Sequence, residues 1–299
     1  MKNRSKIIAL LLSAAALLAS CASMDQGMDD EMTAIALYSV QDGKLTPHTE
    51  EGETYLQADE VNRGRHEYVW NTAMNIIPDS YEPYIHNFRI SSDGEENIMA
   101  YVEPKMTDEE TDLSSWTLAV DLIDAMDRQG ALKTEELNET LIHEFGHILS
   151  FNSTQTIAVP PEELEDEYWA DSWDFSKTYR SWEAITLEES YLNQFFQKFW
   201  GEEQLREWFD RENGITTEEE YYTAYNEMSI KYYTDFVSDY AMTNPDEDFA
   251  ESFTQFVLQD KPEGETVSVQ KILFFYDFPE MMEIREEIRS ALPDKETDQ

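Results

Sequence analysis

The sequence contains a single cysteine, Cys21, in 299 residues, so no disulfide can form within the chain. Basic side chains are also scarce, because 21 Lys and Arg stand against 64 Asp and Glu and the net charge is −43. Phosphate groups are bound by clustered Lys and Arg, so this balance excludes nucleic acid as a partner. No two glycines have the G-x-S-x-G spacing, which argues against a serine hydrolase with a nucleophile elbow.

The apolar run at residues 7–18 is too short to cross a bilayer, and basic residues precede it as in a secretory signal peptide. The letters LASC at residues 18–21 resemble the lipobox at which bacterial lipoproteins are cleaved and acylated. We therefore predict a signal peptide over residues 1–20, and an acylated Cys21 that opens a flexible tether over residues 21–32. The expected location is the bacterial cell envelope, at the outer membrane or cell surface. A lipidated Cys21 cannot act as a nucleophile, and the lipid would be the only membrane contact.

Strand and helix patterns follow one another in residues 33–152, the predicted N-terminal subdomain. Residues 34–40 favour a strand, and residues 59–77 have apolar side chains at helical spacing. Apolar residues alternate within residues 85–102, and the Asp-Gly pair at 93–94 is typical of a tight turn. These residues therefore predict a β-hairpin.

A further strand is predicted at residues 116–122, shortly before a helix that Thr134 can cap. The apolar face of this helix has six members: Leu137, Leu141, Ile142, Phe145, Ile148 and Leu149.

Residues 153–299 predict a mainly helical second subdomain, so the fold class is α+β with a small N-terminal mixed sheet. Gly201 should end one helix, and Pro279 should bend or break the last one. Trp and Tyr are frequent from residue 168 to 240. Two interpretations stay open for them, the core of the helical subdomain or a surface that stacks against glycans.

The stretch ETLIHEFGHILSF at residues 139–151 contains the pattern H-E-x-x-H. Residues four apart on a helix share a face, so His143 and His147 can hold one metal ion, for which Zn²⁺ is the expected identity. Glu144 lies on the next flank of the helix, where it can reach a water bound to that ion and act as a general base. Gly146 has no side chain, so a strand or a substrate could approach the helix closely between the two histidines.

A third metal ligand is expected in residues 237–258. Asn244 can cap a helix there and Pro245 suits its first position. Glu247 and Glu251 lie four apart on that helix, and each also has an ordinary interpretation. Glu247 occupies the capping-box position, and Glu251 is compatible with a solvated acidic face. The pattern of this helix alone does not indicate whether Glu247 or Glu251 is the third metal ligand.

The two stretches together resemble the protease domain of lethal-factor-type toxins. The matching residues are HEFGH at 143–147 and, far downstream, Tyr240, the pair at 243–244, Glu247, the segment 249–251 and Phe253. The chain resembles still more a family of zinc-binding metallopeptidases that occur as bacterial surface lipoproteins. The resemblance covers most of residues 33–290 and implies a zincin-like fold of the gluzincin type.

The resemblance also implies the roles of individual residues. It implies zinc held by His143, His147 and Glu247, with Glu144 as the base. It implies that Tyr240 donates a hydrogen bond to the developing oxyanion and that Glu251 accepts one from the outer nitrogen of a ligand histidine. The 100 residues from His147 to Glu247 exceed the toxin pattern. We therefore interpret residues 153–236 as an insertion or subdomain.

The predicted function is zinc-dependent hydrolysis of peptide bonds in a peptide or protein substrate, by a chain expected to be a monomer. By analogy with zincins, residues 116–122 would be the sheet edge that binds an extended peptide. Two other functions stay open. The chain could keep zinc for structure and bind a host or nutrient ligand as a surface lipoprotein, or it could be a glycan-binding module with an accidental H-E-x-x-H.

Overall fold

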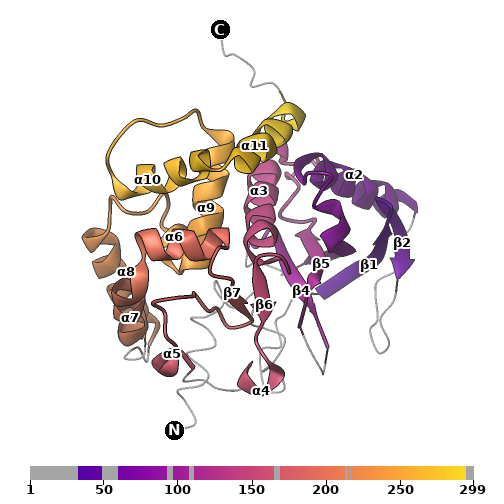
Figure 1. Cartoon of the computed structure of the whole chain (residues 1–299). Coiled ribbons are helices and arrows are strands. Elements are labelled where there is room, and N and C mark those ends of the chain that lie inside the picture. The colour runs from indigo at the N-terminus through magenta and orange to yellow at the C-terminus, as the bar shows by residue number, and fades with distance from the viewer. Residues whose placement is uncertain are drawn as a thin grey trace.

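The computed structural model describes residues 33–48, 60–92, 97–107, 111–164, 169–212, 215 and 217–293. The described part is an α+β fold, in which a mixed sheet and the helix α2 (Glu60–Ile76) lie on one side of the central helix α3 (Thr134–Phe151) (Figure 1). The helices α6 to α10, within residues 191–274, lie on the other side of α3 (Figure 1). The prediction of an α+β chain with an N-terminal sheet is confirmed.

Five strands form the main sheet of the described residues in the order β2-β1-β3-β5-β4. Their bounds are Thr33–Gln41 for β1, Lys44–His48 for β2, Ile85–Ser92 for β3, Ala100–Met106 for β4 and Thr111–Asp121 for β5. The β3 and β5 strands pair in parallel and the other neighbours are antiparallel. The strands predicted at residues 34–40 and 116–122 are confirmed.

The hairpin predicted over residues 85–102 is wrong. Its two strands exist as β3 and β4, but β5 lies between them and pairs with both. The β5 strand is the more favourable neighbour because most of its side chains are buried, so it needs partners on both sides. The predicted turn at residues 93–94 lies outside the described residues.

The prediction that residues 116–122 form the sheet edge is wrong for the same reason. The β5 strand is internal, and the edge of the sheet next to it is β4. Pro104 suits an edge position, because proline has no N–H to donate to a second neighbour, and the register shifts directly after it.

The helix α2 spans Glu60–Ile76 and stops before Pro78, as predicted. The helix α3 spans Thr134–Phe151, and its predicted apolar face is fully buried. Thr134 does not cap α3, because Lys133 occupies the N-cap position and no side-chain cap bond is present. The hydroxyl of Thr134 instead lies 3.5 Å from the carbonyl oxygen of Leu132, so the predicted cap is wrong.

The second half of the described chain is mainly helical. Its elements are α4 (Pro161–Leu164), α5 (Trp169–Ser172), α6 (Tyr191–Phe199), α7 (Gly201–Glu212), α8 (Glu218–Lys231), η2 (Tyr240–Met242), α9 (Pro245–Leu258), α10 (Val267–Phe274), η3 (Phe275–Asp277) and α11 (Pro279–Ala291), with a small hairpin of β6 (Thr156–Ala158) and β7 (Ala184–Thr186). Gly201 follows α6 with a φ of 67°, and Pro279 starts α11 after a break, as predicted.

One hydrophobic core joins the sheet to the helices of the second half. It includes Phe88 from β3, Phe145 from α3, Phe195 from α6 and Phe253 from α9, all with no exposed surface. Most of the large aromatic side chains of the second half fill this core, as one of the two interpretations predicted, and Tyr233 is the most exposed of the remainder. The subdomain boundary at residue 152 stays a prediction.

No helix within the described residues is long and apolar enough to span a membrane. The predicted signal peptide, Cys21 and the tether lie outside the described residues.

Candidate metal centre

The helix α3 brings His143 and His147 to one face. Their spacing of four residues places the two rings one turn apart, with centroids 4.9 Å from each other. The helix contacts α2 and β4 of the sheet layer as well as α6 and α9, so both histidines are buried, at 8% and 4% exposure. Their Nε2 atoms lie 3.1 Å apart.

The helix α9 brings Glu247 to the same point. Asn244 caps α9 by accepting hydrogen bonds from the backbone N–H groups of Asp246 and Glu247, and Pro245 occupies the first turn, as predicted. The side chain of Glu247 faces the histidines rather than closing a capping box. Its Oε2 lies 3.0 Å from Nε2 of His143 and 3.4 Å from Nε2 of His147.

These three separations fit a metal ion. Two ligand atoms about 2.0–2.1 Å from a tetrahedral zinc ion are about 3.3 Å apart, close to the 3.0–3.4 Å observed. Two imidazole nitrogens and a carboxylate oxygen at these distances also need a positive charge among them, either a proton or a cation. This buried group of His143, His147 and Glu247 could therefore hold a metal ion.

Gly146 allows α3 and α9, the two helices that bear the candidate ligands, to approach closely. A Cβ atom at Gly146 would lie 3.1 Å from the Cα of Ala250 and 3.3 Å from its Cβ. The expectation that a strand or a substrate approaches at Gly146 is therefore wrong, since the neighbour there is α9. A side chain at this position would hold Glu247 further from the histidines.

The carboxylates around the histidines favour positive charge at the centre. Burial lowers the pKa of His143, but hydrogen bonds to Glu247 and Glu251 outweigh burial and hold it well above the usual value. Burial also acts against charge on His147, and the carboxylate of Glu247 raises its pKa. Burial raises the pKa of Glu247, yet the two histidines hold it well below the usual range. A metal cation would make the same favourable contacts as these protons.

Glu251 lies one turn beyond Glu247 and contacts the outer nitrogen of His143. Its Oε1 is 2.8 Å from Nδ1 of His143, and its Oε2 accepts a hydrogen bond of 2.6 Å from the hydroxyl of Ser238. A proton on Nδ1 leaves the lone pair of Nε2 directed at Glu247 and His147. The structure thus places Glu251 at the histidine nitrogen that the resemblance implied.

Glu144 is buried on the flank of α3 that faces β4. Burial raises its pKa to about 7, partly offset by the two histidines and by a hydrogen bond from the backbone of Val102 in β4. A carboxyl group with a pKa near neutrality can both accept and release a proton at physiological pH. The edge strand β4 therefore lies beside the candidate general base.

Tyr240 lies in η2 with its ring against His143, at a centroid distance of 5.8 Å. The residue is 36% exposed, so part of it faces solvent. Burial of its hydroxyl and the carboxylates of Glu247 and Glu144 raise its pKa far above the usual value, so the phenol stays protonated. The structure brings Tyr240 to the centre together with the other residues predicted for it.

Sequence patterns did not predict three residues near the centre: Ser238, Asp246 and Tyr179. Ser238 contacts Glu251, and Asp246 accepts a hydrogen bond from Tyr179 beside His147. Asp246 precedes Glu247 in a run of acidic residues, and nothing in the sequence of that run distinguishes a buried Asp246 from a solvent-exposed one. Ser238 lies two residues before Tyr240, and this proximity was the available signal.

A buried ion pair holds α9 on the side away from the histidines. The Nζ of Lys271 lies 2.6 Å from Oδ2 of Asp248, and the indole N–H of Trp200 donates to the same oxygen at 2.7 Å. Lys271 and Asp248 are 1% and 0% exposed. Because Asp248 follows Glu247 directly, Lys271 of α10 and Trp200, the residue after α6, together fix the first turn of α9.

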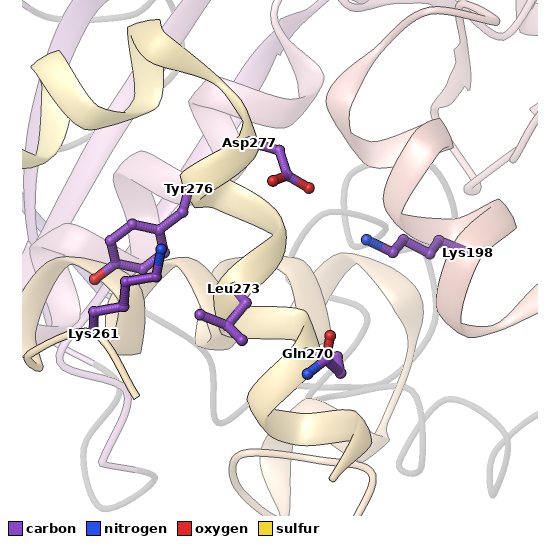
Figure 2. Close-up of a pocket in the computed structure, with 6 residues that line it drawn as sticks. All are labelled: Lys198, Lys261, Gln270, Leu273, Tyr276 and Asp277. Atoms are coloured by element: carbon purple, nitrogen blue, oxygen red, sulfur yellow. The ribbon is translucent and has the colours of Figure 1, made fainter. Parts of the chain in front are cut away.

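A hollow of about 290 Å³ lies on the C-terminal helices and contains none of the residues of the metal centre. Figure 2 shows the six residues that line it: Lys198, Lys261, Gln270, Leu273, Tyr276 and Asp277.

The chain was compared with protein-family models, with curated proteins and with solved structures, and none of the three comparisons found a match.

Proposed function

We propose that the chain is a zinc-dependent metallopeptidase in which His143, His147 and Glu247 hold the zinc ion. The convergence of these three side chains, with Glu144 beside them, supports the proposal most strongly. Two histidines and a glutamate are a ligand set of catalytic zinc sites, which keep a further position open. A bound zinc ion would supply Lewis-acid polarisation of the peptide carbonyl and of the attacking water.

Glu144 is the proposed general base. Its pKa of about 7 in the buried site suits the removal of a proton from water near neutral pH. The same carboxyl group would then pass the proton to the leaving nitrogen. Tyr240 keeps its proton, since its pKa is raised, and is proposed to donate a hydrogen bond to the carbonyl oxygen as that oxygen becomes negative.

The proposed binding strand for the substrate is β4. It is the edge of the sheet nearest to α3, and the backbone of Val102 already reaches Glu144. An extended peptide that added to this edge would place a scissile carbonyl near the centre. Pro104 cannot donate a hydrogen bond, so the pairing stretch is expected to be residues 100–103.

Export and lipid anchoring at Cys21 are also proposals, and so are the envelope location and the monomeric state. They rest on the signal pattern of residues 1–21 and on the resemblance to lipoprotein metallopeptidases. The peptide or protein substrate is proposed from the same resemblance, and the positions of Glu144 and Tyr240 at the centre support it. The alternative of a zinc-containing lipoprotein without peptidase activity is separated by the experiment below.

The test combines zinc content with peptide cleavage. We expect about one zinc per wild-type chain, measured by inductively coupled plasma mass spectrometry, and little or none in His147→Ala and Glu247→Ala. Glu144→Gln should keep zinc and lose cleavage of a mixed peptide library. Zinc in the wild type without any cleavage would favour the non-proteolytic alternative. Absence of zinc after incubation with excess metal, or full cleavage by Glu144→Gln, would refute the proposal.

A further inference from the structure

We propose that Ser238 is a positioning residue that ties Glu251 to the turn that bears Tyr240, so that one hydroxyl couples the metal-ligand side of the centre to the oxyanion side. This inference rests on the proposed function. The hydroxyl of Ser238 donates to Oε2 of Glu251 at 2.6 Å and accepts from the backbone N–H of Ala241 at 3.0 Å. Both contacts are short and well within hydrogen-bonding range.

The contact from Ser238 fixes the orientation of the Glu251 carboxylate, which also contacts His143. Oε1 of Glu251 faces Nδ1 of His143 at 2.8 Å, while Oε2 faces Ser238. Rotation of the Glu251 carboxylate would break both contacts, so the Ser238 hydroxyl restrains the ring of His143 through Glu251. Partners of this kind set the tautomer and the orientation of a ligand histidine.

The second contact fixes the turn η2. Ser238 is followed by Asp239 at the N-cap position of η2, and the side chain of Asp239 makes no cap bond. The Ser238 hydroxyl accepts from Ala241, three residues later, in the manner of a capping serine. Tyr240 lies between these residues, so its ring position against His143 depends on this bond.

Other contacts hold the same turn without reaching Glu251. The hydroxyl of Thr243 donates to the carbonyl oxygen of Tyr240 at 2.8 Å, and the hydroxyl of Tyr225 donates to the carbonyl oxygen of Asp239. These bonds shape the turn from its C-terminal end and from α8. Thr243 therefore offers a matched control, because its hydroxyl restrains Tyr240 but makes no contact with Glu251.

An alanine at position 238 would leave two groups without their partner, Oε2 of Glu251 and the N–H of Ala241. We therefore expect Ser238→Ala to weaken zinc binding about tenfold, at the lower end of the range for outer partners of metal ligands. The rate constant kcat should fall in the same variant because Tyr240 is less well placed. Ser238→Thr keeps the hydroxyl and should restore both quantities.

The experiment measures zinc affinity by competition with a chromophoric chelator and kcat on a cleaved peptide, in the full chain. In Thr243→Val we expect a lower kcat and unchanged zinc affinity. In the double variant Ser238→Ala/Glu251→Gln, zinc affinity should be close to that of Glu251→Gln alone, because both changes break the same link. Thermal unfolding is recorded for each variant, because a lower zinc affinity with an unchanged melting temperature separates a local effect on the centre from a general loss of stability.

Two results would overturn the inference: wild-type zinc affinity in Ser238→Ala, or losses in Ser238→Ala and Glu251→Gln that simply add in the double variant. Failure of the proposed function shows differently, as a wild-type chain that binds no zinc or cleaves no peptide. An active wild type with a Ser238-independent zinc site would refute this inference alone.

Discussion

Gly146 and Ala250 face each other so closely that a Cβ atom on Gly146 would lie 3.1 Å from the Cα of Ala250. The contact lies between His143 and His147 on α3 and directly beside Glu251 on α9. It therefore sets the separation of the two helices at the level of the candidate metal ligands. The absence of a side chain at position 146 is a geometric condition of the centre.

Replacing Gly146 with alanine should displace α9 by a few tenths of an ångström and weaken metal binding. Overpacking of this kind costs about 1–3 kcal/mol, partly offset by up to about 1 kcal/mol from the higher helix propensity of alanine. If a part of this net cost falls on the metal-bound state, zinc affinity should fall by about threefold or more, because about 1.4 kcal/mol corresponds to a factor of ten. Gly64→Ala is the matched control, because no atom of the described residues, apart from its chain neighbours and its own helix backbone, lies within 4 Å of a Cβ there. Equal zinc affinity in both variants would show that the close approach is not needed.

Replacing Tyr240 with phenylalanine should lower kcat by about 10² or more and leave the zinc content unchanged. The ring can keep its place against His143, while the hydroxyl that is proposed to stabilise the oxyanion is lost. The measurement is the steady-state rate on a cleaved peptide together with metal analysis of the same sample. A rate equal to that of the wild type would remove Tyr240 from the proposed mechanism.

Local patterns in the sequence predicted the parts of the centre that a single helix carries. The spacing of His143 and His147 needs only helical geometry, and Asn244 with Pro245 needs only capping chemistry. The preference for Glu247 over Glu251 as the candidate ligand depends on the packing of α9 against α3, across 100 residues of chain, so the pattern of one helix could not predict it. The resemblance to known metallopeptidases supplied that choice.

The errors have the same physical origin. The Asp-Gly pair at 93–94 is a local turn signal, but strand order depends on which neighbours bury the apolar faces of β5. Pro104 was the sequence signal for an edge strand, because proline removes one donor from the ladder. Gly146 signalled a close approach, and only tertiary structure shows that the partner is Ala250.

Replacing Lys271 with methionine should destabilise the protein by about 3–5 kcal/mol, because it leaves the carboxyl group of Asp248 buried without its partner. The loss should be smaller at pH 5 than at pH 8. Burial already raises the pKa of Asp248 to about 6, so the group can be neutral in acid. The double variant Lys271→Met/Asp248→Asn should regain most of the stability. Chemical denaturation at both pH values measures these differences, and equal losses in the single and double variants would argue against the ion pair as the cause.

Replacing Glu183 with glutamine should stabilise the protein at high pH. Glu183 is 5% exposed, and burial, with Asp246 and Glu103 nearby, raises its pKa well above 4.5. The folded state therefore holds this proton more tightly than the unfolded state does. Protonation of Glu183 contributes to the free energy of unfolding. This contribution is fully present below pH 4.5 and is lost as pH rises toward the pKa of Glu183 in the folded state, by at most about 1.4 kcal/mol per pH unit.

Glutamine resembles the neutral form of Glu183 and does not titrate, so the variant should lack this loss. We expect Glu183→Gln and the wild type to have similar free energies of unfolding at pH 5 and the variant to be the more stable at pH 8. The measurement is urea denaturation of metal-free protein, and the exposed Glu188→Gln is the control with the same change in charge. If Glu188→Gln gained as much stability at pH 8 as Glu183→Gln, the effect would come from net charge, because relief of the overall charge of −43 does not depend on burial.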